Sequence, residues 1–345
     1  MSGTQMKSVL KTAALKSPVQ KSPALKTIRP VPDATRMAII EESDAGGERP
    51  LWRAHTLAMA ADGTVHGDFA ANHVAFAPGE VQRGSLYVAQ GEVDAMAALQ
   101  NGAAGCLSVH KLRGPHVLVD DLHMALARIA RASRNRSRAT MTALAGFGAG
   151  SMIDVVLHDA LDRASRGMAW IADADLGMAA SLCTLAADRN HALFTLDNAD
   201  DARALRPLLF VSGSHLDHAV GEAISATLQQ GGAAVLPADS CDFAAWRAAA
   251  LDAGAQVYGY GRKPSADIRL IDTVTMEDGT TLVTADMMGR AMCWSLSEGL
   301  FEDADVLDSL AIMGAMRACG ASLGAAALAL CGHVEEEEAP LAVAV

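Results

Sequence analysis

The sequence predicts an α/β protein in which a small α/β domain precedes a larger, P-loop-like one with a mostly parallel sheet. From residue 50 onward, strand-like and helix-like segments alternate, which is typical of α/β proteins. In the second half, most strand-like segments are short, continuous apolar runs separated by helices. Such runs indicate a parallel sheet that is buried on both faces.

Length and composition support a folded protein and exclude some functions. The chain has 345 residues, of which 51% are hydrophobic and 20% are charged, so it can fill the cores of about two domains. Its net charge of −12 argues against a nucleic-acid partner, because a protein that binds nucleic acid normally has a basic face. No apolar run reaches the roughly 18 residues of a membrane span, and no apolar stretch follows the early lysines as in a secretory signal. We therefore expect a cytoplasmic protein without a transmembrane segment.

The first globular half begins at Pro50. Its expected elements are a helix in 51–60, two strands joined by a turn in 73–90, a helix and a buried strand in 93–109, and a strand and a helix in 116–137. The charged run from Arg131 to Arg138 marks the expected junction with the second half.

The second half opens with a strand, a glycine-rich turn and a long helix in residues 139–164. Further strands are expected in 168–173, 192–197, 207–213, 233–239, 255–261, 267–276 and 280–287. The last two alternate in polarity, and Asp278-Gly279 between them predicts a hairpin turn. A pair of helices, in 305–320 and 322–333, is expected to complete this half.

Four segments follow from this pattern. They are a flexible basic tail over 1–47, an N-terminal domain over 48–135, a central domain over 136–333, and an acidic then apolar tail over 334–345. Lysines recur among Ser, Pro and Thr in the first of these, and its prolines break any helix. An alternative interpretation of that segment is a basic arm that docks on an acidic partner or an anionic surface.

The glycine-rich stretch Gly146-Phe147-Gly148-Ala149-Gly150-Ser151 is the main candidate for a binding site. It lies between a strand and a helix, where backbone N–H groups and the helix dipole can hold phosphate. A working P-loop also needs a lysine just before its Ser or Thr, and Gly150 stands there. Gly146, Gly148, Gly150 and Ser151 are therefore candidate nucleotide- or anion-binding residues. The competing interpretation is a tight turn whose glycines allow close packing.

Two other groups of residues have weaker metal-binding patterns. Glu92 and Asp94 together with Asp173 and Asp175 resemble a Toprim site, in which carboxylates at strand ends hold Mg²⁺. The competing interpretation is solvated ends of strands or helices. Elsewhere, His215 and His218 have the spacing of two metal ligands on a helix. A helix start capped by Ser214, with Asp217 three residues later, explains the same residues without a metal, so no metal site is expected.

The six cysteines form no CxxC pair and have no histidines at zinc-site spacing. Each lies among Ala, Leu or Met, so we expect core thiols in a reducing compartment.

Taken in order, residues 50–333 resemble the Mur ligases, most closely the MurF type, which adds D-alanyl-D-alanine to a UDP-muramoyl-tripeptide. Residues 50–69 are similar to the family's opening helix and turn. Residues 83–89, Arg-Gly-Ser-Leu-Tyr-Val-Ala, resemble the core of its uridine-binding segment. Residues 231–282 are similar to the later half of its ATP domain, and the helices around 311–328 resemble that domain's end. The resemblance implies a uridine-binding type of domain over 48–135 and an ATP-binding type over 136–333.

The chain departs from the family at most positions that carry chemistry. Ala77-Pro78-Gly79 replaces an Asp-Ser/Thr-Arg step, and Val93-Asp94-Ala95 replaces a DGH motif. The family's TGxxGK(T/S) motif aligns with residues 145–151, with Gly150 at the lysine.

Further departures fall on the metal site and the second substrate. Thr195 aligns with a Mg²⁺-binding Glu, and Gly221 falls where the family has a carbamylated lysine. The HxxNxLAA motif appears in residues 302–310 without its His or Asn. The last residues fall where a C-terminal ligase domain is expected to begin.

The resemblance and these departures together predict a catalytically inactive Mur ligase homologue with no catalytic or metal-binding residues and no required cofactor. It would act as a scaffold or regulator through protein partners in cell-wall synthesis or division, among them a true Mur ligase, or through a UDP-linked ligand. The alternative is an active ATP-dependent ligase, or one of altered chemistry, that uses ATP and Mg²⁺ with a separate C-terminal subunit. Its glycine-rich loop would then still hold phosphate.

Overall fold

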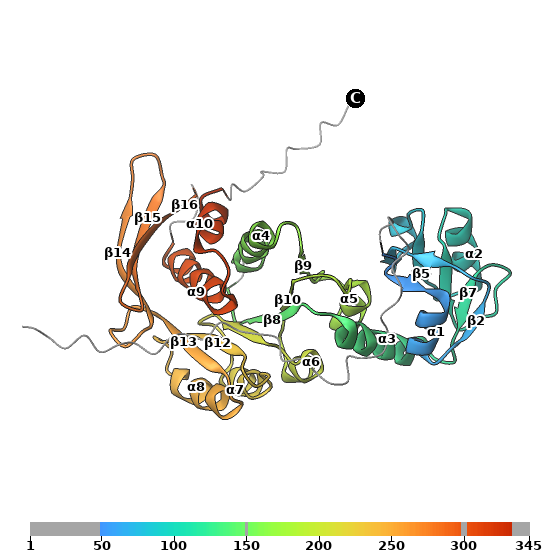
Figure 1. Cartoon of the computed structure of the whole chain (residues 1–345), viewed down its shortest axis with the longest axis horizontal. Coiled ribbons are helices and arrows are strands. Elements are labelled where there is room, and N and C mark those ends of the chain that lie inside the picture. Colours follow the sequence, from blue (N-terminus) through green and yellow to red (C-terminus); the bar gives the residue numbers. More distant parts are fainter. Residues whose placement is uncertain (1–48, 149–150, 298–301, 333–345) are drawn as a thin grey trace, which may run out of the picture.

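A computed structural model describes residues 49–148, 151–297 and 302–332. The predicted tails 1–47 and 334–345 lie outside these residues, as does Gly150. The described part contains two main sheets, one of five strands and one of nine. Figure 1 shows the smaller sheet with α1 and α2 at one end of the molecule and the larger sheet with its helices at the other.

The five-stranded sheet has the order β2-β7-β6-β5-β4. Its strands are β2 (Thr64–His66), β4 (His73–Ala75), β5 (Ser85–Val88), β6 (Gly105–Ser108) and β7 (His116–Leu118). Strands β4 to β7 pair in parallel, and β2 pairs antiparallel with β7. The two strands expected in 73–90 are therefore present, but they are parallel neighbours.

Short elements surround this sheet. They are β1 (Trp52–Arg53), α1 (Ala54–Ala61), β3 (Ala70–Ala71), a 3₁₀ turn η2 (Pro78–Glu80) and α2 (Glu92–Gln100). The helix α3 (Leu122–Arg136) then leads to the larger sheet. It contains the charged run from Arg131 as its last turns, and Asp121 begins it by accepting the N–H of Met124 at 2.8 Å. The domain boundary at residue 135 stays a prediction.

The nine-stranded sheet has the order β16-β15-β14-β13-β12-β11-β8-β10-β9. Its strands are β8 (Thr140–Ala145), β9 (Ala169–Ile171), β10 (His191–Thr195), β11 (Leu209–Ser212), β12 (Ala233–Pro237), β13 (Gln256–Gly261), β14 (Ile268–Thr275), β15 (Thr281–Met287) and β16 (Ala291–Leu296). All neighbouring pairs from β9 to β14 are parallel, whereas β15 and β16 add two antiparallel pairs. The predicted α/β class with a mostly parallel sheet is confirmed.

Helices cover both faces of this sheet because its strands are apolar on both sides. Those that follow α3 are α4 (Ile153–Ser165), α5 (Met178–Thr184), α6 (Ala199–Leu205), α7 (His218–Ala226), α8 (Phe243–Asp252), α9 (Asp303–Cys319) and α10 (Leu323–Gly332). Buried residues of α5 to α8 share a core with Met141 and Ala143 of β8, whereas α4, α9 and α10 share the other core with Leu144. Figure 1 shows the two groups on opposite sides of the sheet. None of the helices in the described ranges combines the length and apolarity that a bilayer crossing requires.

The cysteines only partly follow the prediction of core thiols. Cys106 and Cys183 are buried, and burial raises the pKa of each thiol to about 12. Cys241, Cys293 and Cys331 are exposed, so the prediction is wrong for these three. Cys293 and Cys331 lie next to the buried Trp294 of β16 and Leu330 of α10, and local composition cannot separate the two faces of an element. Cys241 lies in the loop between β12 and α8.

The packing of α7 on α8 requires a glycine, Gly221, where the two helices meet. Trp246 of α8 is fully buried, and its indole nitrogen donates to the carbonyl of His218 at 3.0 Å. A Cβ at Gly221 of α7 would lie 2.4 Å from the Trp246 ring. This close contact leaves no room for a side chain at Gly221.

Gly221→Ala is therefore expected to lower the free energy of unfolding by about 1–3 kcal/mol, because a buried ring must move to accept the methyl group. Chemical denaturation measures this loss. Gly324→Ala is the matched control in helix α10, where a Cβ would meet only Ser322 Oγ at 3.5 Å. That change should be neutral or stabilising by up to about 1 kcal/mol. Equal effects of the two substitutions would contradict this account of the packing.

Candidate functional site

The candidate site lies at the carboxyl ends of the parallel strands, where the chain order reverses across the sheet. After β8 the chain passes to β9 and β10 on one side, and then to β11 on the other side of β8. Open α/β sheets bind ligands in the crevice at this switch point. A pocket of about 590 Å³ occupies this position and is formed by the loops after β8, β11, β12 and β13 and by the start of α9. The glycine-rich loop therefore borders this pocket.

The backbone at Gly146 is fixed by the neighbouring loop after β11. Gly146 has a φ of +74°, and a Cβ there would lie 2.4 Å from Leu216 Cβ. Its carbonyl accepts the N–H of His215 at 2.9 Å, and the carbonyl of Ala145 accepts the N–H of Gly213 at 2.8 Å. A Cβ at Gly213 would in turn lie 2.2 Å from the Gly146 oxygen. The two loops thus meet backbone to backbone, as the close-packing interpretation of the glycines expects.

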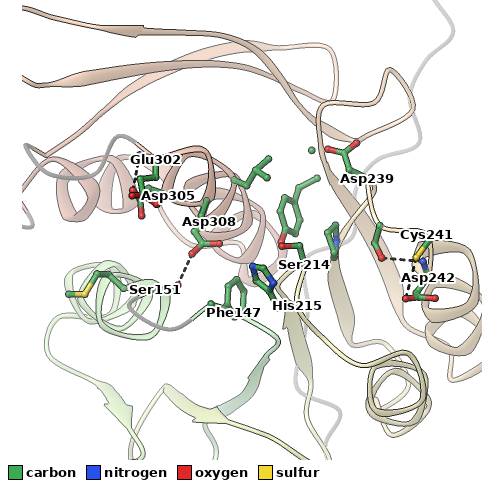
Figure 2. A pocket seen from close by; sticks show the side chains of 18 residues that line it. Phe147, Ser151, Ser214, His215, Asp239, Cys241, Asp242, Glu302, Asp305 and Asp308 are labelled. Atoms are coloured by element: carbon green, nitrogen blue, oxygen red, sulfur yellow. Dashed lines mark hydrogen bonds between the residues drawn. The ribbon is translucent and has the colours of Figure 1, made fainter.

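The other loop residues have different surroundings. A Cβ at Gly148 would meet only the ring of His215, at 3.6 Å, so this position has room. Ser151 points to α9, and its hydroxyl donates to Asp308 Oδ2 at 2.6 Å (Figure 2). The same Ser151 oxygen accepts the N–H of Ile153 at the start of α4. Ser151 therefore joins two helices, and sequence reasoning did not find its partner.

Carboxylates line much of the pocket. Two of them, Asp239 and Asp242, lie in the loop after β12. The other three, Glu302, Asp305 and Asp308, lie at the start of α9. No lysine or arginine is among the lining residues of the described chain. The charged side chains that line the described pocket are therefore acidic.

Several of these carboxylates already have backbone or side-chain partners. Asp239 accepts the N–H groups of Arg262 and Lys263 at 2.7 and 3.0 Å. Asp242 pairs with His218 Nδ1 at 2.8 Å, and Asp305 accepts the N–H of Glu302 at 3.0 Å at the start of α9. Figure 2 shows these acidic side chains around the two walls of the pocket.

Asp308 has the most perturbed carboxyl group of the site. Its burial raises the pKa to about 6, and the nearby charge of Asp305 adds to this. The Ser151 hydroxyl and His215 act in the opposite direction. A carboxyl with this pKa binds a proton more readily in the folded protein than in the unfolded chain, where a value of about 4 is expected.

The weaker motifs do not form metal sites. Glu92 begins α2 beside the five-stranded sheet, whereas Asp173 follows β9 of the nine-stranded sheet, so the Toprim-like alternative is wrong. Asp94 instead accepts the Tyr87 hydroxyl at 3.2 Å and the Gln90 N–H at 3.1 Å. Across the described ranges, no three His, Cys, Asp or Glu side chains are grouped as metal ligands.

The histidine pair lies at the start of α7. The capped helix start is present, but its cap is Asp217, which accepts the N–H groups of Ala219 and Val220 at 2.9 and 3.2 Å. The expected cap, Ser214, lines the pocket together with His215. His218 faces Asp242 and Glu222 instead.

The two main sheets and the glycine-rich loop define an α/β protein in which a small five-stranded sheet precedes a larger, mostly parallel one. Solved structures narrow the fold further. A MurF structure from Acinetobacter baumannii matches with a TM-score of 0.66 and 16% identity over 83% of this chain and 69% of that chain.

Two other structures agree. A UDP-N-acetylmuramoylalanyl-D-glutamyl-2,6-diaminopimelate--D-alanyl-D-alanyl ligase from the same organism matches with a TM-score of 0.67 and 17% identity over 84% of this chain and 70% of that one. MurF ligase from Thermotoga maritima in complex with ADP matches with a TM-score of 0.56 and 18% identity over 74% and 65%. The fold is that of the Mur ligases, as the sequence resemblance implied. No protein-family model and no curated protein matches the sequence.

The Asp308 carboxyl predicts a specific pH dependence of stability. Because its folded-state pKa is raised, its protonated form favours folding, and this contribution is lost as the pH rises from about 4 to about 6. Asp308→Asn keeps an oxygen for Ser151 and removes the charge. The variant should therefore be more stable than the natural protein above pH 7, by on the order of 1–3 kcal/mol, with the difference shrinking toward pH 4.

Thermal unfolding across this pH range measures the effect. Asp188→Asn, at an exposed turn outside the pocket, is the control and should leave the pH profile unchanged. Parallel profiles for the natural protein and Asp308→Asn would contradict the assignment.

Proposed function

We propose that this protein is a Mur ligase homologue that does not perform ATP-dependent ligation and acts by binding. It is linked to peptidoglycan synthesis through its fold. The observation that carries the proposal is the charge of the pocket beside the glycine-rich loop. Five carboxylates and no lysine or arginine line the described part of that pocket.

A nucleoside triphosphate does not fit these groups. Phosphoryl transfer depends on positioning and on cations that neutralise the phosphate oxygens. Gly150 stands at the position of the P-loop lysine, and the Ser151 hydroxyl, which a P-loop directs to Mg²⁺, donates to Asp308 instead. Bringing a triphosphate next to these carboxylates would place like charges together in a partly buried site.

Two further positions support the proposal. Gly221 aligns with the lysine that the family carbamylates, and Trp246 fills the space in which its side chain would begin. Thr195, at the exposed end of β10, aligns with a metal-binding Glu. Removing a single charged stabiliser costs about 10²–10³ in rate at many active sites. Losses at several independent steps are therefore incompatible with ordinary turnover by these residues.

Calorimetry with ATP and Mg²⁺, with and without UDP-muramoyl-tripeptide, tests the proposal. No binding heat for ATP and no phosphate release are expected, and an active MurF ligase in the same buffer is the positive control. ATP hydrolysis that depends on the muramoyl peptide would overturn the proposal and favour the active-ligase alternative.

Variants that restore the lysine test whether its absence or the acidic lining of the pocket prevents ATP binding. Gly150→Lys alone should not bind ATP, because the carboxylates that line the pocket remain. Combining it with Asp305→Asn and Asp308→Asn removes two negative charges and should give measurable binding. If Gly150→Lys alone binds ATP as tightly as the triple variant, the acidic lining is not what excludes the nucleotide.

The binding role can be tested separately. A protein that keeps a Mur ligase fold without its chemistry can still present that fold's surfaces to proteins of cell-wall synthesis or division. Mixing the full chain with a MurF-type ligase should give a faster-sedimenting complex in analytical ultracentrifugation. Independent sedimentation of the two proteins would remove that ligase from the partners.

A further inference from the structure

A second cavity lies at the opposite end of the parallel strands and does not belong to the pocket described above. It has a volume of about 630 Å³ and is bordered by α3, α5 and α6. Residues at its rim, Asn135, Arg206 and Gln229, lie close in sequence to the starts of β8, β11 and β12. Figure 1 shows the three helices next to one another in the middle of the molecule. The cavity is therefore at the amino ends of the parallel strands, away from the glycine-rich loop.

One wall of this cavity is apolar. Ala127 and Ala130 of α3 and Met178, Ala179 and Leu182 of α5 line it, and these two helices pack against each other. The alanines leave volume that larger side chains would fill, while Leu182 and Ala130 belong to the buried core. Cavities of about 300–1,000 Å³ with apolar walls and a few polar groups are typical of small-molecule sites.

Arginines also line the cavity. They are Arg131 and Arg134 of α3 and Arg203 and Arg206 at the end of α6, and they are accompanied by a single carboxylate, Asp201. This local excess of positive charge occurs in a chain whose net charge is −12. The charged part of the cavity lining therefore differs in sign both from the pocket beside Gly146 and from the protein as a whole.

Two of the arginines have structural partners and two do not. Arg134 donates to the carbonyls of Leu205 and Arg206 at the end of α6, and Arg203 pairs with Asp200. For the side chains of Arg131 and Arg206, the described ranges contain neither a hydrogen bond nor an ion pair. Asp201 accepts a hydrogen bond from Asn198 Nδ2 at 2.9 Å and forms no ion pair with either side chain in the described ranges.

Guanidinium groups without a partner are suited to carboxylates and phosphates, to which they donate two parallel hydrogen bonds. We propose that the cavity between α3, α5 and α6 binds a ligand with one anionic group and an apolar body. Arg131 and Arg206 hold the anion, and the wall formed by Ala127, Ala130 and Met178 holds the apolar part. This site does not depend on the function proposed above.

Probes that combine or separate the two chemical features test the proposal on the full chain. Octanoate and octyl phosphate carry both features and should each bind at one site, mapped by NMR shifts of residues in α3, α5 and α6. The tighter of the two identifies the anion as carboxylate or phosphate. Acetate and inorganic phosphate lack the apolar body, and 1-octanol lacks the charge. These three should bind about tenfold or more weakly, because each loses one set of contacts.

Substitutions of the arginines and of Met178 test whether these residues bind the two octyl probes. Arg131→Gln should weaken octanoate and octyl phosphate about tenfold, and adding Arg206→Gln should weaken them further. Arg131 is exposed and unpaired in the described structure, so its substitution does not endanger the fold. Met178→Gln should weaken the two octyl probes and leave inorganic phosphate unchanged. Arg163→Gln, on α4 of the opposite face and paired with Asp159, is the matched control and should bind both probes normally.

Three results would overturn the proposal. They are no binding of either octyl anion to the natural protein, undiminished binding to the Arg131→Gln and Arg206→Gln double variant, and NMR shifts outside the three helices. Tenfold loss in the single Arg131 variant, with unchanged thermal unfolding, would support it.

Discussion

The backbone contact between Gly146 and Gly213 is the constraint on which the candidate pocket depends. It joins the loops after two adjacent parallel strands, and neither position has space for a Cβ. The hydrogen bonds of Gly213 and His215 to the carbonyls of Ala145 and Gly146 use backbone groups that the loop would otherwise leave free. The loop thus begins in a fixed geometry, and His215 and Ser151 take their places in the pocket from it.

The two cavities of the large sheet have opposite electrostatic character. Acidic side chains surround the carboxyl ends of the strands, while arginines surround the amino ends between α3 and α6. In the Mur ligase fold, the first of these positions is the one that the strand order marks for a ligand. In this chain, the arginines that we propose to bind an anion lie at the second position. A fold by itself does not fix the charge of the site built on it.

Much of the fold could be predicted from the sequence because apolar runs and turn residues are local signals. The strand and helix around the glycine-rich loop and the Asp278-Gly279 hairpin are present as expected. The edge strand β16 was missed, because its turn uses Met288 and Gly289, both with positive φ. A methionine rarely adopts that conformation and gives no turn signal. The Ser151–Asp308 bond joins residues 157 positions apart, and no local pattern indicates such a pair. The sequence predicts the cap of α7 at Ser214 instead of Asp217, because serine and aspartate are both favoured at the N-cap.

Trp52 is an internal reporter of the contact between the N-terminal part of the chain and helix α5. Its indole nitrogen donates to the carbonyl of Cys183 in α5 at 3.0 Å, and the Arg136 guanidinium lies 3.7 Å above its ring. Any rotation of the N-terminal sheet away from the large sheet must break the first contact and remove the second. The indole would then pass from a buried, cation-stacked setting into water. Tryptophan emission is sensitive to such a change of environment, so the emission of Trp52 would report its separation from α5 and Arg136.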